Sequence, residues 1–269
     1  MGSLIGSVGL GLTRLSKPFA QYTNMPLLPA YAPTIVASAG AFFGIQALSR
    51  ALSPRVSSHY RKLTKRSQEE WNIKVASMVN CAVLLPLVVR CFRVLGAIEH
   101  NKAFGTHPEL LRLSAIATGY FLWDTVVELG RGDAQFVAHG LSTLCIFLFS
   151  FRPFVLYFVP VSLVYELSTP FLNIHWFLDK TNCTGSTLQL INGLTLISTF
   201  FGARLAYGSY ASYQLLTTVW NARGQIPSWL AAIYLVGNPV LNVLNVFWFT
   251  KMIRAIQKRF VKKSPSKAD

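Results

Sequence analysis

Apolar runs recur along the whole chain, separated by short polar or basic stretches. A transmembrane helix needs about 20 consecutive, mostly apolar residues, and most of the runs come close to that length. The predicted spans are residues 31–49, 72–95, 113–129, 136–151, 154–178, 188–207 and 229–250. The pattern predicts an all-α, polytopic membrane bundle of seven helices, or of six if the small-residue run 31–49 does not cross.

The run 154–178 carries a glutamate in its middle and a polar stripe along one helical face. A carboxylate at bilayer depth is costly, which makes Glu166 a candidate functional residue. Pro160 and Pro170 each remove a helix hydrogen bond, so we expect bends near Leu156 and Glu166. The residues of the stripe follow one another at i, i+4, i+7 and i+11, and they are Ser162, Glu166, Thr169 and Asn173.

The spans 113–129 and 136–151 repeat this arrangement, with polar residues at i, i+4 spacing. Arg204 lies near the end of the span 188–207. If the stripes face one interior volume, they predict a polar, cavity-lining site made of Asp124, Glu128, His139, Glu166, Asn173 and Arg204. A closed polar network that only fixes the helix register is the alternative, and the asparagines of the last span, Asn238, Asn242 and Asn245, are expected to join helices in that way.

Composition agrees with a membrane protein, since 52% of the residues are hydrophobic and only 13% are charged. The net charge of +15 comes from short basic runs beside apolar spans. This distribution favours anionic lipid headgroups as partners of the 50–66 loop and the C-terminal tail, rather than nucleic acid. No residue spacing predicts a metal site, a disulfide or a bound cofactor, and nothing in the sequence indicates an oligomeric state.

The placement of Lys and Arg also predicts orientation and domain limits. With seven spans, the 50–66 loop and the C-terminus lie on the same side, which collects most of the basic residues and is therefore expected to be cytosolic. Residues 1–30 are predicted to be a flexible or interfacial arm, 31–258 the transmembrane domain, and 259–269 a basic cytosolic tail.

Several of these residues together resemble the TLC-domain family. The similarity runs from about residue 55 to 258, and its most specific part is the stretch ELSTPFLN-x-HW that begins at Glu166. Further matching positions are Tyr120 with Asp124, Asp133 with His139 one helix on, Arg204, and Asn245 followed by Trp248 and Phe249. The resemblance implies a multi-pass protein of the endoplasmic reticulum.

The same resemblance implies two possible functions. The family includes ceramide synthases, which acylate a sphingoid base with acyl-CoA, and proteins implicated in membrane lipid composition without an established reaction. Ceramide synthases carry two adjacent histidines, whereas this chain reads Ala138-His139. We therefore expect a protein of lipid homeostasis that binds lipid in an interior cavity. The alternative is an N-acyltransferase that uses acyl-CoA as co-substrate, with His139 as the catalytic base.

Overall fold

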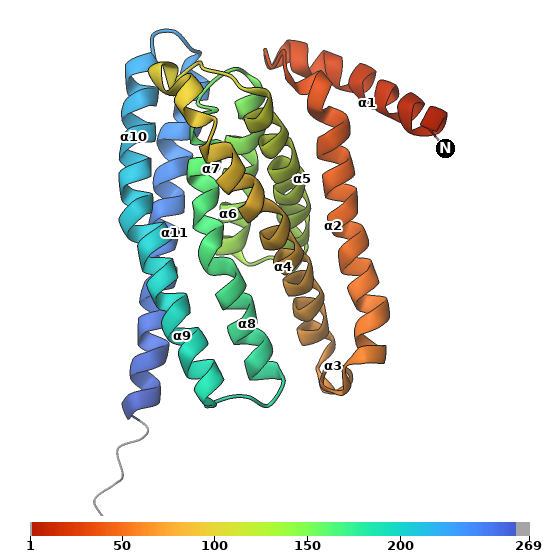
Figure 1. Cartoon of the computed structure of the whole chain (residues 1–269), viewed down its shortest axis with the longest axis vertical. Helices are drawn as coiled ribbons and strands as arrows, with labels where there is room; N and C mark the ends of the chain where they lie inside the picture. The colour runs from red at the N-terminus through yellow and green to blue at the C-terminus, as the bar shows by residue number, and fades with distance from the viewer. Residues whose placement is uncertain (1, 262–269) are drawn as a thin grey trace, which may run out of the picture.

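The computed structural model describes the backbone of residues 2–261 and the side chains of residues 7–257. This part of the chain is all-helical and forms no strand. Its α-helices are α1 (Gly2–Tyr22), α2 (Leu28–Val56), α3 (Ser58–Lys62), α4 (Lys65–Phe92), α5 (Pro108–Arg131), α6 (Ala134–Leu148), α7 (Phe158–Leu163), α8 (Thr169–Lys180), α9 (Thr187–Phe200), α10 (Tyr207–Ala222) and α11 (Ser228–Val261). Figure 1 shows the long helices running side by side as one elongated bundle, with α1 leaving it near one end.

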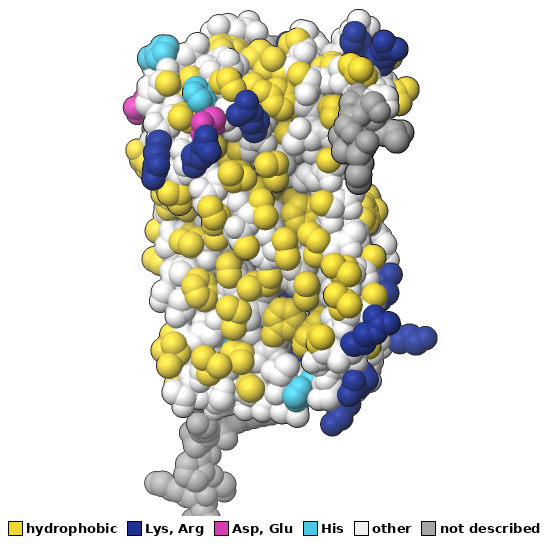
Figure 2. Space-filling view, turned by 45° about the vertical axis from the view of Figure 1, so that its right-hand side comes forward, with side chains coloured by type: hydrophobic (Ala, Val, Ile, Leu, Met, Phe, Trp, Pro, Cys, Tyr) yellow, Lys and Arg dark blue, Asp and Glu magenta, His cyan; other side chains and the backbone are white. Residues whose placement is uncertain are grey.

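Five helical segments of the described chain are long and apolar enough to cross a membrane. They are Leu28–Val56, Lys65–Phe92, Pro108–Arg131, Ala134–Phe151 and Ser228–Gln257. The small-residue run 31–49 therefore lies inside a helix of spanning length, as the sequence predicted. On the face seen in Figure 2, Lys and Arg gather toward the two ends and apolar side chains are spread over the band between them. The chain is an all-α, multi-pass membrane protein.

The predicted span 154–178 is interrupted and starts later than expected. Phe154 and Leu156 are buried in a turn at one end of the bundle, where Val155 adopts a left-handed φ of 51°. The helix begins only at Phe158, so Pro160 falls in its first turn, where no N–H donor is needed. The bend expected near Leu156 is therefore absent. A 3₁₀ stretch, Val164–Ser168, separates α7 from α8 at Glu166, as Pro170 predicted.

The predicted span 188–207 belongs to a much longer helical stretch. A π-helical turn, Phe201–Ala206, joins α9 to α10, so the helix continues to Ala222. The sequence missed this continuation because the α10 segment mixes polar residues with the apolar ones. Its buried Ala211, Leu215 and Val219 nevertheless give it an apolar packing face, and it packs against α11.

The N-terminal residues, before the first predicted span, are largely helical. Residues 1–30, predicted as a flexible or interfacial arm, contain the helix α1, which packs against α2. Its Val8, Leu15 and Tyr22 remain strongly exposed. The predicted basic tail, 259–269, lies outside the described side chains.

The turn between α5 and α6 follows directly from its residues. Gly132 ends α5 with a left-handed φ of 73°, and its N–H donates to the Glu128 carbonyl at 3.0 Å. The Asp133 carboxylate then accepts a hydrogen bond from the Gln135 N–H at 3.2 Å and caps α6. This tight turn keeps α5 and α6 antiparallel and places Glu128 beside the start of α6.

Candidate functional site

An interior cavity of about 350 Å³ lies among α4, α5, α6, α8, α9 and α11. Its volume is within the range of about 300–1,000 Å³ that is usual for ligand pockets. We call it the main cavity. The sequence-predicted residues that line it are Asp124, Glu128, His139, Glu166, Asn173 and Arg204, and the other charged groups on its wall are Glu70, Lys74, Arg131 and Lys251. The structure thus places these six residues around one volume.

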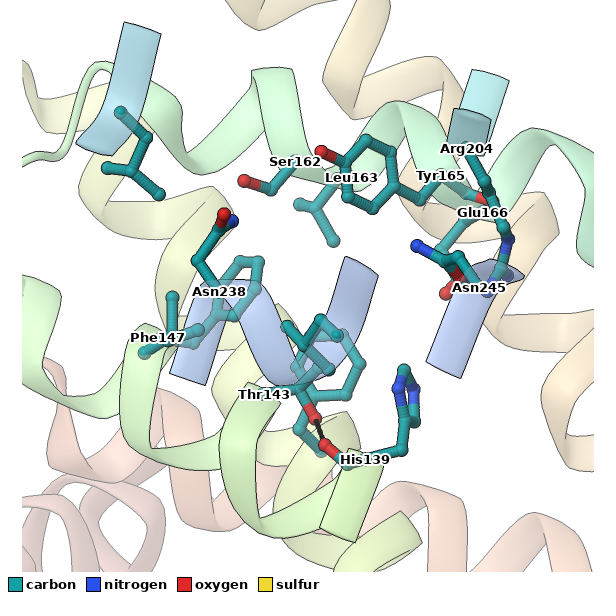
Figure 3. Close-up of a pocket in the computed structure, with 14 residues that line it drawn as sticks. His139, Thr143, Phe147, Ser162, Leu163, Tyr165, Glu166, Arg204, Asn238 and Asn245 are labelled. Carbon is teal, nitrogen blue, oxygen red and sulfur yellow. Dashed lines mark hydrogen bonds between the residues drawn. The ribbon is translucent and has the colours of Figure 1, made fainter. Parts of the chain in front are cut away.

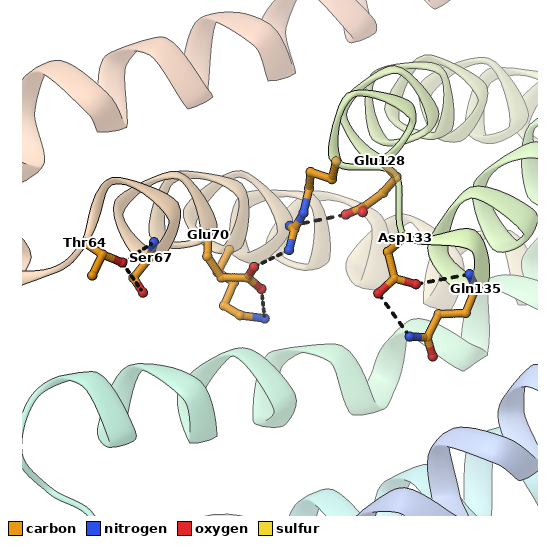
Figure 4. Close-up of polar contacts among 8 residues, drawn as sticks. Thr64, Ser67, Glu70, Glu128, Asp133 and Gln135 are labelled. Atoms are coloured by element: carbon orange, nitrogen blue, oxygen red, sulfur yellow. Dashed lines mark hydrogen bonds and ion pairs between the residues drawn. The ribbon is translucent and has the colours of Figure 1, made fainter.

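A network of ion pairs forms one side of the main cavity near the end of the bundle that carries the 50–66 loop. Arg131, the last residue of α5, contacts the carboxylates of both Glu70 and Glu128 (Figure 4). The Glu128 contact is 3.4 Å, and Lys74 Nζ lies 3.5 Å from Glu70 Oε1. Partly buried networks hold their geometry better than isolated surface pairs. This network joins α4 to α5 at the rim of the cavity.

Asp124 and His139 lie at similar depth, about one helical turn further inside. A Cβ added to Gly140 would lie 3.0 Å from Thr125 Oγ1, so α5 and α6 approach closely at that level. Asp124 directly precedes Thr125 and His139 directly precedes Gly140, so both lie at this level. Elsewhere on the cavity wall, Asn173 Nδ2 donates to Ser77 Oγ at 3.0 Å and so joins α8 to α4.

His139 is held by packing rather than by a carboxylate. Its ring meets Trp248 edge to face at 5.3 Å, and Trp248 Nε1 donates to Gln135 Oε1 at 3.0 Å. The buried Nδ1 of His139 makes no hydrogen bond to any residue in the described part of the chain. Buried polar groups are usually hydrogen-bonded, so an orphaned imidazole nitrogen on a cavity wall indicates a position for an exogenous group.

Arg204 comes from the π-helical turn and binds the irregular stretch opposite it. Because Pro170 has no N–H, the Glu166 carbonyl takes the N–H of Thr169 instead. The Tyr165 carbonyl, which that N–H would otherwise serve, accepts Arg204 Nε at 3.0 Å. The remaining guanidinium contacts are with Ser168 Oγ at 3.0 Å, Thr169 Oγ1 at 3.1 Å and Asn245 Oδ1 at 3.4 Å.

Glu166 lies near this guanidinium without forming an ion pair with it. No contact within 4.0 Å joins Glu166 to Arg204 or to another basic side chain that the structure describes, and its hydrogen-bond contact is with the Cys81 thiol, at 3.9 Å. Non-helical backbone at membrane depth is tolerated where it lines a cavity. The 3₁₀ and π segments supply Glu166 and Arg204, both 92% buried, to the same wall.

A second, smaller cavity of about 40 Å³ continues from the main cavity toward the opposite end of the bundle. The two share Phe121, His139, Glu166 and Arg204 on their walls. Figure 3 shows His139 on one side of this cavity, with Tyr165, Glu166 and Arg204 across from it. Ser162, the first residue of the predicted stripe, lines the smaller cavity.

Comparison with known proteins places this arrangement in a family. The sequence profile described as TLC domain matches residues 70–254, which contain every predicted site residue. The chain belongs to the TLC-domain family. An uncharacterized TLC domain-containing protein of Schizosaccharomyces pombe is 39% identical over 93% of this chain and 87% of its own length. Topoisomerase I damage affected protein 4 of Saccharomyces cerevisiae is 32% identical, covering 73% of this chain and 72% of its own. Human TLC domain-containing protein 4 is 26% identical, covering 81% and 87%.

Membership of the TLC-domain family associates the chain with membrane proteins of lipid-related processes. The matched region begins at Glu70, the first charged residue of the cavity wall, and ends just beyond Met252, the last lining residue. The TLC domain of this chain therefore coincides with the part that builds the main cavity. The N-terminal helix α1 and α2 lie outside the matched region.

Sequence reasoning missed one complete wall of the TLC-domain cavity. Four polar residues of α4 follow the same i, i+4, i+7, i+11 spacing that drew attention to Glu166; they are Glu70, Lys74, Ser77 and Cys81. The first three line the main cavity and Cys81 contacts Glu166. Their spacing could have identified this wall. Two further polar residues, Asp133 and His175, do not line the main cavity: Asp133 caps α6, and His175 packs near Gly193.

Proposed function

We propose that this TLC-domain protein binds a membrane lipid in the main cavity and acts in lipid homeostasis without catalysing a reaction. The observation that carries the proposal is the meeting of six polar, sequence-predicted residues on one cavity inside the bundle. Intramembrane charges are expensive and persist chiefly where they serve a site. The same wall also carries Ile73, Phe121, Leu172, Phe200 and Met252, which supply contact area for methylene groups.

The alternative, an acyltransferase that uses acyl-CoA, finds less support in the geometry. A histidine base is usually fixed in one tautomer by a hydrogen bond from its second nitrogen. Among the described residues, no carboxylate binds Nδ1 of His139, and Ala138 stands where ceramide synthases have their other histidine. The orphaned nitrogen is better suited to bind a lipid headgroup.

The proposed topology has seven spans. To the five segments of spanning length it adds the interrupted α7–α8 stretch and the joined α9–α10 stretch, both of which run along the bundle in Figure 1. Seven crossings put the 50–66 loop and the C-terminus on one side. The positive-inside rule makes that side cytosolic, in a membrane that we propose to be the endoplasmic reticulum.

A tag at the C-terminus tests the proposed orientation. In cells whose plasma membrane alone is permeabilised, an antibody is expected to reach the tag, because the basic loop and the C-terminus share the cytosolic side. A tag placed before α1 serves as the control and should be reached only after internal membranes are opened. The reverse labelling pattern would contradict the topology.

Filling the main cavity tests the proposed lipid site. Leu172→Trp adds bulk to the cavity wall and is expected to lower the amount of lipid that co-purifies with the protein several-fold, measured by mass spectrometry. Leu167→Trp is the matched control, because Leu167 has nearly the same exposure (44% against 41%) but does not line the main cavity. Equal lipid content in wild type and both variants would contradict the proposal.

A further inference from the structure

Three cationic groups on the wall of the main cavity, those of Lys74, Arg131 and Arg204, already contact protein acceptors. The guanidinium of Arg204 donates hydrogen bonds to Tyr165, Ser168, Thr169 and Asn245. Arg131 contacts Glu70 and Glu128, and Lys74 also contacts Glu70. These three cations are therefore already partnered, which makes them less available than a free cation to an anionic ligand such as a carboxylate or a phosphate.

Several acceptors on the same wall have no strong partner among the described residues, although Glu70 is paired with Lys74 and Arg131. Glu128 is 6% exposed, yet its Oε2 is buried without a hydrogen-bond partner among the residues that the structure describes. Asp124, one turn deeper, makes no hydrogen bond or ion pair to the described part of the chain, and Glu166 accepts only the weak contact of the Cys81 thiol. His139 Nδ1, also on this wall, is orphaned as well.

Buried acceptors without partners are destabilising, and carboxylates are more so than neutral groups. A ligand that complements this wall must therefore bring hydrogen-bond donors and positive charge. A primary ammonium has both, since it carries three N–H donors and a compact charge. A quaternary ammonium has the charge without the donors, and an anionic head has neither.

We infer that the main cavity recognises the primary ammonium of a lipid head, with Asp124 and Glu128 as its direct partners and with Glu166 and His139 lining the same cavity. The inference rests on the proposed lipid binding and specifies its ligand. Lys251 lies at the rim, where Nζ contacts Gln135 Oε1 at 3.3 Å and is paired with no carboxylate of the described chain. It is available to a phosphate, so an aminophospholipid would satisfy both ends of the site.

Binding by the purified full chain in detergent, freed of endogenous lipid, tests the inference. The probes are phosphatidylethanolamine, phosphatidylcholine, phosphatidylglycerol and oleylamine, and bound lipid is measured by native mass spectrometry. Phosphatidylethanolamine is expected to bind about tenfold more tightly than the choline or glycerol lipid, the ratio that one charge-assisted hydrogen bond supplies. Competition by oleylamine would support the ammonium alone as the recognised group, and its failure to compete would support an aminophospholipid.

Asp124→Asn keeps the shape of the side chain and removes its charge. We expect it to lower phosphatidylethanolamine binding about tenfold and to leave binding of the choline lipid unchanged. Asp133→Asn is the matched control, because Asp133 caps α6 outside the cavity and asparagine caps equally well. Glu128→Gln provides the same measurement if the Asp124 variant does not fold.

Two negative outcomes have different meanings. Equal binding of the ethanolamine, choline and glycerol lipids, unaltered by Asp124→Asn and Glu128→Gln, would overturn the ammonium inference and leave lipid binding intact. Failure of the wild-type protein to bind any of the four probes would overturn the proposed lipid binding itself.

Discussion

Arg204→Leu is expected to remove most of the folded protein. The leucine leaves Tyr165, Ser168, Thr169 and Asn245 without their shared donor inside the bundle. Truncating one member of a buried, charged hydrogen-bond network typically costs about 3–5 kcal/mol, a large part of the stability of most domains. The measurement is the recovery of monodisperse protein in detergent, together with its thermal unfolding midpoint.

Arg223→Leu is the control for this substitution. Arg223 is exposed at the end of α10, where it donates to the Trp220 carbonyl and stacks on the Trp220 ring. The same chemical change there should alter the unfolding midpoint little, because exposed contacts contribute little to stability. Arg204→Leu with a wild-type midpoint would show that the four contacts of the guanidinium do not hold the irregular segments together.

Around Arg204, the sequence predicted the individual features of the site but not the contact between them. Its position near the end of an apolar run predicted a residue of the interior, and Pro170 predicted the break at Glu166. The sequence could not show that the two features depend on each other. The arginine donates to the Tyr165 carbonyl, which loses its usual helical partner because of Pro170, and this hydrogen bond crosses the tertiary contact between the π-helical turn and the 3₁₀ stretch.

The cavity itself was predictable because polar stripes on apolar helices are costly to expose to lipid and therefore face the protein interior. Three carboxylates, one imidazole and one guanidinium could not all face lipid, so convergence was the least costly solution. The wall contributed by α4 was not predicted, because Glu70 directly follows a basic loop and has the pattern of a solvent-exposed helix start. In the structure Glu70 lies at the rim of the cavity, where Arg131 and Lys74 contact its carboxylate.

The start of the fifth predicted span was wrong for a related reason. An apolar run such as 154–178 looks the same whether its residues face lipid or protein. Phe154 and Leu156 are apolar because they are buried in the end of the bundle, at 1% and 0% exposure. Hydrophobicity alone cannot separate these two environments, whereas the interruption at Glu166 was visible because proline acts on the backbone directly.

Gly119→Leu is expected to separate α5 from α2 and to destabilise the protein strongly. A Cβ at Gly119 would lie 2.5 Å from the Ile35 carbonyl oxygen and 2.5 Å from Ser38 Cβ, closer than real Cβ contacts occur. The same approach allows Ser38 Oγ to donate to the Ile116 carbonyl at 2.8 Å. Small residues at helix interfaces permit such packing in membranes, where no hydrophobic effect draws the helices together.

A second glycine of the same helix, Gly130, serves as the control for Gly119. Gly130 has open space around its Cβ position. Alanine there should be neutral or stabilising by up to about 1 kcal/mol, because alanine favours the helix over glycine. Gly119→Ala should instead destabilise by about 1–3 kcal/mol, the usual effect of overpacking, and Gly119→Leu by more. Thermal unfolding of the purified variants measures both. If alanine at position 119 raised the midpoint as it does at position 130, the close contact of α5 with α2 would be refuted.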